Sequence, residues 1–103
     1  MAEEVRIPNP GLPSDGHSIR VIANGTPVAI FRVAGELYAI DPRCTHIGGP
    51  LDQGPLSGTE VTCPWHHSVF DVRDGKVLRG PATKPVAHYR VRLDGDSIIL
   101  VRE

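Results

Sequence analysis

Two short pairs of metal-binding residues constrain this chain of 103 residues more than any other feature of its sequence. The pairs are Cys44-Thr45-His46 and Cys63-Pro64-Trp65-His66, which form the pattern C-x-H…C-x-x-H with residues 47–62 between them. The chain has no other cysteine. Because thiolate and imidazole are the preferred ligands of zinc and iron, the two pairs indicate that the chain folds around a metal centre.

Length and composition allow one small globular domain and exclude several classes of partner. Apolar residues make up 40% of the chain and charged residues 22%, which is typical of a soluble protein. A formal net charge of -1 provides no basic field for binding nucleic acid. We expect no membrane segment, because no apolar run approaches the length of about 20 residues that a spanning helix needs.

The cellular compartment is predicted from the N-terminus. Residues 1–6 carry acidic side chains where a secretory signal has positive charge, and no apolar run follows them. We therefore expect a cytoplasmic protein. A disulfide between Cys44 and Cys63 is disfavoured in that reducing compartment, and it would leave the adjacent histidines unexplained.

The secondary structure is predicted to be all-β. Ten prolines and eleven glycines separate short segments, none of which shows the apolar periodicity of a helix. The turn sequences Asn24-Gly25 and Asp94-Gly95-Asp96 indicate hairpins. We expect the first ten residues to cover a sheet edge or to run along the surface. The expected strands are 18–23, 27–33, 36–40, 59–63, 68–78 with a turn at Asp74-Gly75, 85–93 and 97–102.

Turn-forming residues divide the chain into two structural parts. They are concentrated in residues 41–82, whereas residues 1–40 and 83–103 contain the longer predicted strands. We therefore predict one domain over residues 1–103. In it, a loop-rich metal-binding subdomain, 41–82, is inserted between the two strand blocks of a basal sheet, 1–40 and 83–103.

The spacing of the ligands leaves more than one metal site open. Structural zinc sites typically have two to four residues between paired cysteines and three to five between paired histidines. Here each pair instead combines one cysteine with one histidine. A centre with two irons suits this arrangement, with the cysteines on one iron and the histidines on the other. A single zinc ion and a disulfide remain alternatives.

The two pairs resemble the motifs of the Rieske [2Fe–2S] proteins. The resemblance rests on Cys44-Thr45-His46-Ile47-Gly48, on Cys63-Pro64-Trp65-His66, and on Gly80-Pro81-Ala82, which is similar to the proline loop that covers the cluster in this family. It implies a Rieske-type fold of antiparallel sheets and one [2Fe–2S] cluster.

The resemblance also implies the cluster ligands and the reduction potential. Cys44 and Cys63 would bind the inner iron, and His46 and His66 the outer one. Rieske centres have potentials of about -150 to +300 mV, against about -400 mV for plant-type ferredoxins.

Four further positions place this chain within that range. Gly49 and Trp65 stand where high-potential members carry an extra disulfide. Ser68 matches a serine that donates a hydrogen bond to the cluster, but Phe70 replaces a tyrosine with the same role. A potential in the lower or middle part of the range is expected.

The resemblance implies an electron carrier and not an enzyme, and we predict no catalytic residue. The predicted role is a soluble, monomeric one-electron shuttle from a flavin-containing NAD(P)H reductase to a terminal oxygenase, with transient contacts. A small subunit of a larger oxidoreductase, such as assimilatory nitrite reductase, and a non-redox zinc module are the alternatives. His67 is either a spare ligand or a surface residue. Trp65 either packs in the core or lies over the cluster, where it could meet a partner.

Overall fold

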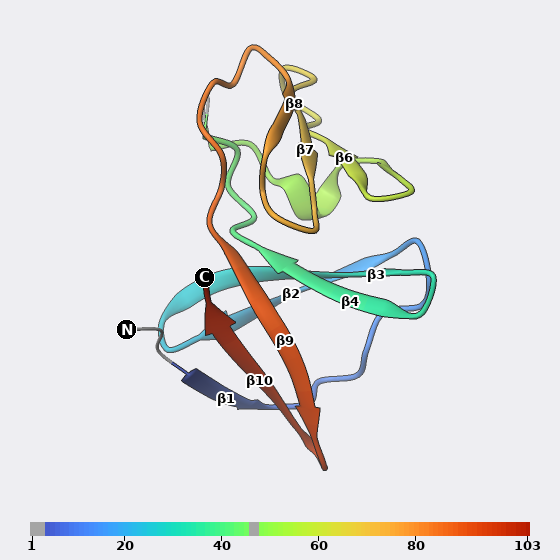
Figure 1. Cartoon of the computed structure of the whole chain (residues 1–103), viewed down its shortest axis with the longest axis vertical. Coiled ribbons are helices and arrows are strands. Elements are labelled where there is room, and N and C mark those ends of the chain that lie inside the picture. The colour runs from blue at the N-terminus through green and yellow to red at the C-terminus, as the bar shows by residue number, and fades with distance from the viewer. Residues whose placement is uncertain (1–3, 46–47) are drawn as a thin grey trace.

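The structure is a computed structural model that describes residues 4–45 and 48–103. Within these residues it consists of β-strands and one short 3-10 helix, which confirms the all-β prediction. Figure 1 shows a larger sheet in the lower half of the molecule and a smaller sheet with several loops above it. No helix in the part of the chain that the structure describes is long and apolar enough to cross a membrane.

The lower half is one antiparallel sheet of six strands in the order β1-β10-β9-β4-β3-β2. The first and last strands of this order approach one another, so the sheet is curled. Its strands come from both ends of the chain. They are β1 (Glu4–Pro8), β2 (Ser18–Ala23), β3 (Thr26–Val33), β4 (Glu36–Ile40), β9 (His88–Asp94) and β10 (Ser97–Arg102).

The tight turns of this sheet use residues with left-handed backbone conformations. Between β2 and β3, Asn24 and Gly25 have φ angles of 53° and 80°, and between β3 and β4, Ala34 and Gly35 have φ angles of 51° and 82°. Two successive residues with positive φ form the turn whose twist matches that of paired strands. This local geometry explains why the predicted meander forms; its boundaries are those expected, except that β3 begins at Thr26 and not at residue 27.

The N-terminal strand completes one edge of the sheet. Val5 lies opposite Leu100 and Ile7 lies opposite Ile98 in the β1–β10 ladder, in agreement with the expectation that this segment covers a sheet edge. The alternation in β9 groups Leu93 with inward-facing residues, but Leu93 is 48% exposed. The β9–β10 hairpin extends past the core at this point, as Figure 1 shows, so an inward position there has nothing to pack against.

The upper half contains a second antiparallel sheet, in the order β5-β6-β7-β8. Its strands are β5 (Leu56–Ser57), β6 (Glu60–Thr62), β7 (Val69–Asp71) and β8 (Val77–Arg79), and the 3-10 helix η1 (Leu51–Gln53) precedes them. The strands expected at 59–63 and 68–78 are β6 and the β7–β8 hairpin.

Strand β3 connects two hydrophobic cores because it is buried on both faces. Val28 and Ile30 face the interior of the curled sheet. Ala29 and Phe31 face the upper half, in a second core that also contains both cysteines. The side chains that anchor the upper half to the sheet are therefore the same ones that surround the cysteines.

Candidate metal centre

The two cysteine-containing loops have the same backbone closure. In the first loop, the Cys44 amide donates to the Gly49 carbonyl (2.9 Å), and the Gly48 amide donates to the Cys44 carbonyl (2.7 Å). In the second, the Cys63 amide donates to the Ser68 carbonyl (2.7 Å), and the His67 amide donates to the Cys63 carbonyl (3.0 Å). Each loop thus spans six residues and is fixed at its cysteine.

The same position in each loop adopts a left-handed conformation. Gly48 has a φ angle of 79°, and its counterpart in the second loop, His67, has a φ angle of 65°. Left-handed backbone suits glycine, and it costs free energy in a residue that carries a Cβ. His67 therefore occupies a position for which the loop geometry favours glycine.

The loops bury their cysteines and expose their tips. Cys44 and Cys63 are 3% and 0% exposed, belong to the same core, and are both free thiols. His66 and His67 are exposed, and Trp65 is 54% exposed, so Trp65 does not pack in the core. The fourth predicted ligand, His46, lies outside the residues that the structure describes.

Gly49 and Trp65 bring the two loops into contact. A Cβ atom at Gly49 would lie 2.6 Å from the Cys63 sulfur and 3.3 Å from the nearest Trp65 ring atoms. The missing side chain of Gly49 therefore allows both the thiol and the indole to approach the backbone of the first loop. The indole covers the point at which the sequence resemblance places a disulfide in high-potential relatives.

A third loop, residues 80–84, packs against the other two. The Ala82 amide donates to the buried Ser68 hydroxyl oxygen (2.9 Å), and the Thr45 hydroxyl donates to the Lys84 carbonyl (2.6 Å). The bond between Gly80 and Pro81 is cis. The Ser68 oxygen accepts from Ala82, so its own hydrogen can be donated elsewhere.

Comparison with known families identifies the fold and the cofactor. The Rieske [2Fe-2S] domain matches residues 7–90, which include both cysteine–histidine pairs. The chain belongs to the Rieske family. Its cofactor is one Rieske-type [2Fe–2S] cluster, and family membership excludes the single zinc ion and the disulfide as alternatives.

Named relatives of this Rieske protein are ferredoxins. It is 38% identical over 89 residues to the ferredoxin component of the naphthalene 1,2-dioxygenase/salicylate 5-hydroxylase systems of Ralstonia sp, an alignment that covers 86% of each chain. The protein is therefore an electron carrier and not itself an enzyme.

Solved structures of ferredoxins also resemble this chain. The ferredoxin of carbazole 1,9a-dioxygenase from Nocardioides aromaticivorans superposes with a TM-score of 0.81 at 31% identity, covering 96% of this chain and 95% of that one. A structure described as a complex of reduced oxygenase and oxidized ferredoxin in carbazole 1,9a-dioxygenase matches with a TM-score of 0.84 at 27% identity, covering 93% and 92%.

Two Asp-x-Arg turns flank the cysteine-containing loops of this Rieske fold. Asp41 accepts hydrogen bonds from the Arg43 amide (2.9 Å) and guanidinium (2.7 Å) just before Cys44. Burial raises the pKa of Asp41, but the Arg43 hydrogen bonds outweigh it, and the net pKa lies below its ordinary value. Hydrogen bonds from Arg73 likewise lower the pKa of Asp71. Both carboxylates therefore remain ionised well into acid and balance their arginines.

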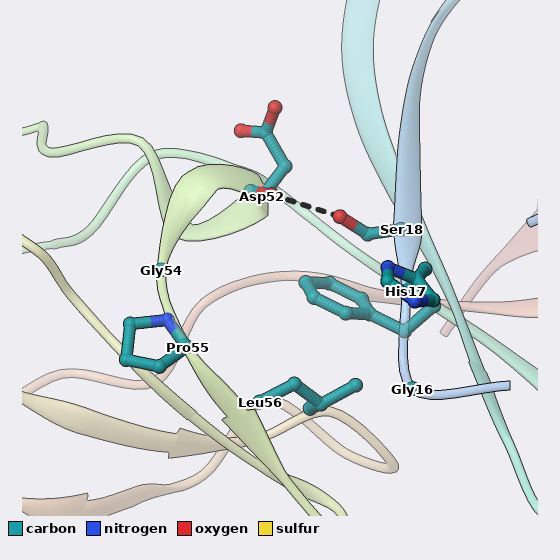
Figure 2. Close-up of a pocket in the computed structure, with 8 residues that line it drawn as sticks. Gly16, His17, Ser18, Asp52, Gly54, Pro55 and Leu56 are labelled. Atoms are coloured by element: carbon teal, nitrogen blue, oxygen red, sulfur yellow. Dashed lines mark hydrogen bonds between the residues drawn. The ribbon is translucent and has the colours of Figure 1, made fainter.

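A pocket lies away from the loop tips, where the upper half meets the edge of the lower sheet. Its volume is about 290 Å³, and Figure 2 shows it between His17 and Ser18 on one side and Asp52, Pro55 and Leu56 on the other. The Ser18 hydroxyl donates to the Asp52 carbonyl (2.8 Å) across this junction. Arg20 also binds the Asp52 carboxylate, at 2.6 Å. The pocket therefore marks a joint between the two halves and not the cysteine site.

Sequence reasoning did not identify two contacts of the site. The Thr45–Lys84 hydrogen bond joins residues 39 positions apart, and no local pattern indicates it. The approach of Gly49 to Cys63 also depends on how two separate loops stack. A glycine beside a predicted ligand is nevertheless a usable signal for close backbone approach.

Proposed function

We propose that this Rieske protein carries single electrons from a flavin-containing NAD(P)H reductase to a terminal oxygenase, with Cys44, His46, Cys63 and His66 as the cluster ligands. The ferredoxin relatives support the role. The observation that carries the ligand assignment is the matched closure of the Cys44 and Cys63 loops, which fixes one buried thiol in each.

The described residues fit a cluster with an inner and an outer iron. Both thiols are in the core, where they would hold the inner iron away from water, whereas the His66 imidazole is exposed and would hold the outer iron near the surface. A Rieske-type [2Fe–2S] cluster supplies reversible one-electron chemistry at a potential within the range given above. The contribution of the chain is to bind the group, to exclude water from its sulfur side and to expose its histidine side.

The proposal also covers the cellular compartment, the oligomeric state and the division of the chain into two parts. We place the protein in the cytoplasm as a monomer that meets its partners transiently, since redox encounters are typically small and short-lived. Its division into a cluster-binding part, 41–82, and a basal part, 1–40 with 83–103, is proposed on the same footing. It is supported by the separation of the strands into two sheets.

The ligand assignment is tested by exchanging one histidine. His66→Cys would replace a neutral imidazole by a thiolate, which adds negative charge to the cluster, so the reduction potential should fall or the cluster should be lost. The measurements are a redox titration together with iron and sulfide analysis of the purified protein. His67→Gly is the matched control in the same loop, and its potential should equal that of the wild type. An unchanged potential and spectrum in His66→Cys would contradict the assignment.

The carrier role is tested separately by size. A free shuttle should elute from a native extract as a small protein, whereas a permanent subunit of a larger oxidoreductase should elute with that complex. Elution of all the protein in a large complex would contradict the proposed role and favour the subunit alternative.

A further inference from the structure

The segments at the cysteine end contain the cations Arg43, Lys76, Arg79 and Lys84 and no carboxylates. Asp and Glu are absent from residues 42–51, 61–70 and 75–87, although the whole chain has a formal net charge of -1. The carboxylates of this half of the molecule, Asp41, Asp52, Glu60, Asp71 and Asp74, lie outside these segments. A partner that approaches these segments therefore meets local positive charge, although the net charge of the whole chain is negative.

The cations of these segments differ in whether a carboxylate of the described residues pairs with them. Arg43 pairs with Asp41 (2.7 Å), Arg73 pairs with Asp71 (2.8 Å), and Lys76 lies 4.0 Å from Asp74. By contrast, Arg79 and Lys84 are exposed. No carboxylate of the described residues, 4–45 and 48–103, forms an ion pair with either of them.

The fold brings both cations to the loop tips. Arg79 lies opposite Val69 in the β7–β8 ladder, and Val69 directly follows the second cysteine loop. Lys84 is joined to the first loop through its carbonyl, which accepts from Thr45 (2.6 Å). Figure 1 shows strand β8, which ends at Arg79, and the segment that follows it in the upper half of the molecule.

An exposed aromatic side chain lies on the same loops. Trp65 is 54% exposed, although tryptophan is usually well covered in a folded protein. Tryptophan and arginine are the side chains that most often dominate binding at interfaces, where charged residues form the rim. The Asp52 carboxylate of the upper half pairs with Arg20 on β2. It therefore does not neutralise the positive charge of Arg79 or Lys84.

We propose that the surface formed by Trp65, Arg79 and Lys84 docks a redox protein whose own docking face is rich in carboxylates. The inference rests on the proposed function, because it assumes that the electron passes near His66. Opposite charges on the two faces would speed the encounter and orient it, and the effect would weaken with salt. The indole would supply the apolar contact at the centre.

The test uses small charged oxidants with the reduced holoprotein. One electron leaves the protein and converts ferricyanide to ferrocyanide, or hexaamminecobalt(III) to its cobalt(II) form, and stopped-flow absorbance gives the second-order rate constants. The ferricyanide rate should fall as ionic strength rises, and the cobalt rate should rise. A protein that acted only through its negative net charge would show the opposite signs, which would overturn the inference.

Charge-reversal variants locate the effect. Lys84→Glu and Arg79→Glu should each lower the ferricyanide rate at low salt by about threefold or more. The matched control is Arg92→Glu, which makes the same charge change on β9 near the opposite end of the molecule, and its rate should stay within about twofold of wild type. An equal loss in the control would overturn the local surface. If a Glu variant loses its visible spectrum, Lys84→Gln or Arg79→Gln should show a smaller loss of the same sign.

An acidic polypeptide tests the class of partner. Poly-L-glutamate should slow the ferricyanide reaction of the wild type by occupying the surface, and it should affect Lys84→Glu less, whereas poly-L-lysine should not slow it. Equal inhibition of wild type and Lys84→Glu would overturn the docking site. A protein with no reversible one-electron spectrum would instead contradict the proposed carrier role, so the two failures are distinguishable.

Discussion

His67 occupies a backbone conformation that favours glycine. Its φ angle of 65° matches the 79° of Gly48, the residue at the same position of the first loop. A side chain at such a position costs roughly 1 kcal/mol or more in backbone strain, part of which a glycine would give back through its greater freedom in the unfolded chain. His67 is exposed and directly follows the proposed ligand His66. Strained backbone conformations are most often found at functional sites.

Replacing His67 with glycine should therefore stabilise the holoprotein. We expect a gain of about 0.5–1 kcal/mol, seen as a rise in the thermal midpoint at a fixed scan rate. Gly48→Ala is the reciprocal variant. A Cβ there meets no atom within 4 Å, so it adds backbone strain alone and should lower the midpoint by a similar amount. A lower midpoint for His67→Gly would mean that the imidazole makes a stabilising contact worth more than the strain.

Helix η1 connects the upper half to the edge strand β2 through one carboxylate. Asp52 binds Arg20 through two hydrogen bonds (2.6 and 3.2 Å), and its side chain is only 10% exposed. The paired geometry raises the pKa of Arg20 through the Asp52 hydrogen bond. A two-point, largely covered pair stabilises a fold more than a pair in open solvent.

Removing this carboxylate should loosen the joint. Asp52→Ala should lower the stability by about 0.5–1.5 kcal/mol. The matched control is Asp94→Ala, which deletes the Arg6–Asp94 pair, where both side chains are more than half exposed; its cost should be close to zero. Thermal unfolding of the two variants checks the difference. Equal midpoints would contradict a special role for the Asp52 joint.

Elements that form through contacts between neighbouring residues were predicted more fully than elements that need contacts between distant parts of the chain. Strands β2, β3 and β4 were predicted because their turns, such as Asn24-Gly25, are encoded locally. The pairing of β1 with β10 joins opposite ends of the chain, so the sequence indicated an edge-covering segment but not its register. The four ligands stay a prediction from the family motif: the structure brings Cys44 and Cys63 into one core and exposes His66, and His46 lies outside the described residues. The exposure of Trp65 was left open because it depends on the stacking of two loops across Gly49.

At the scale of the whole molecule, the potential depends on which donors reach the cluster. In the hydrogen bond between Ser68 and Ala82, the Ser68 hydroxyl oxygen is the acceptor. The hydroxyl hydrogen is not used in that bond and can be donated to the cluster. Phe70 is fully buried and has no hydroxyl to donate. Fewer hydrogen bonds to the cluster stabilise the reduced form less and lower the potential.

A redox titration of the wild type should therefore give a value in the lower or middle part of the Rieske range of about -150 to +300 mV. Ser68→Ala should lower that value further, because it removes the hydroxyl donor that the family resemblance assigns to this position. Thr83→Ala, at an exposed residue of the third loop, is the control and should leave the value unchanged. A wild-type potential near the upper limit of the range would contradict this account of the donors.

The matched closure of the two loops also bears on the speed of electron transfer. In each loop, two backbone hydrogen bonds fix the cysteine between its neighbours, and β-sheet holds the residues that follow the second loop. Atoms held in this way move little when the charge of the centre changes by one electron. The inner-sphere reorganisation energy should then be small, and the activation barrier should come mainly from water rearranging around the exposed histidine side.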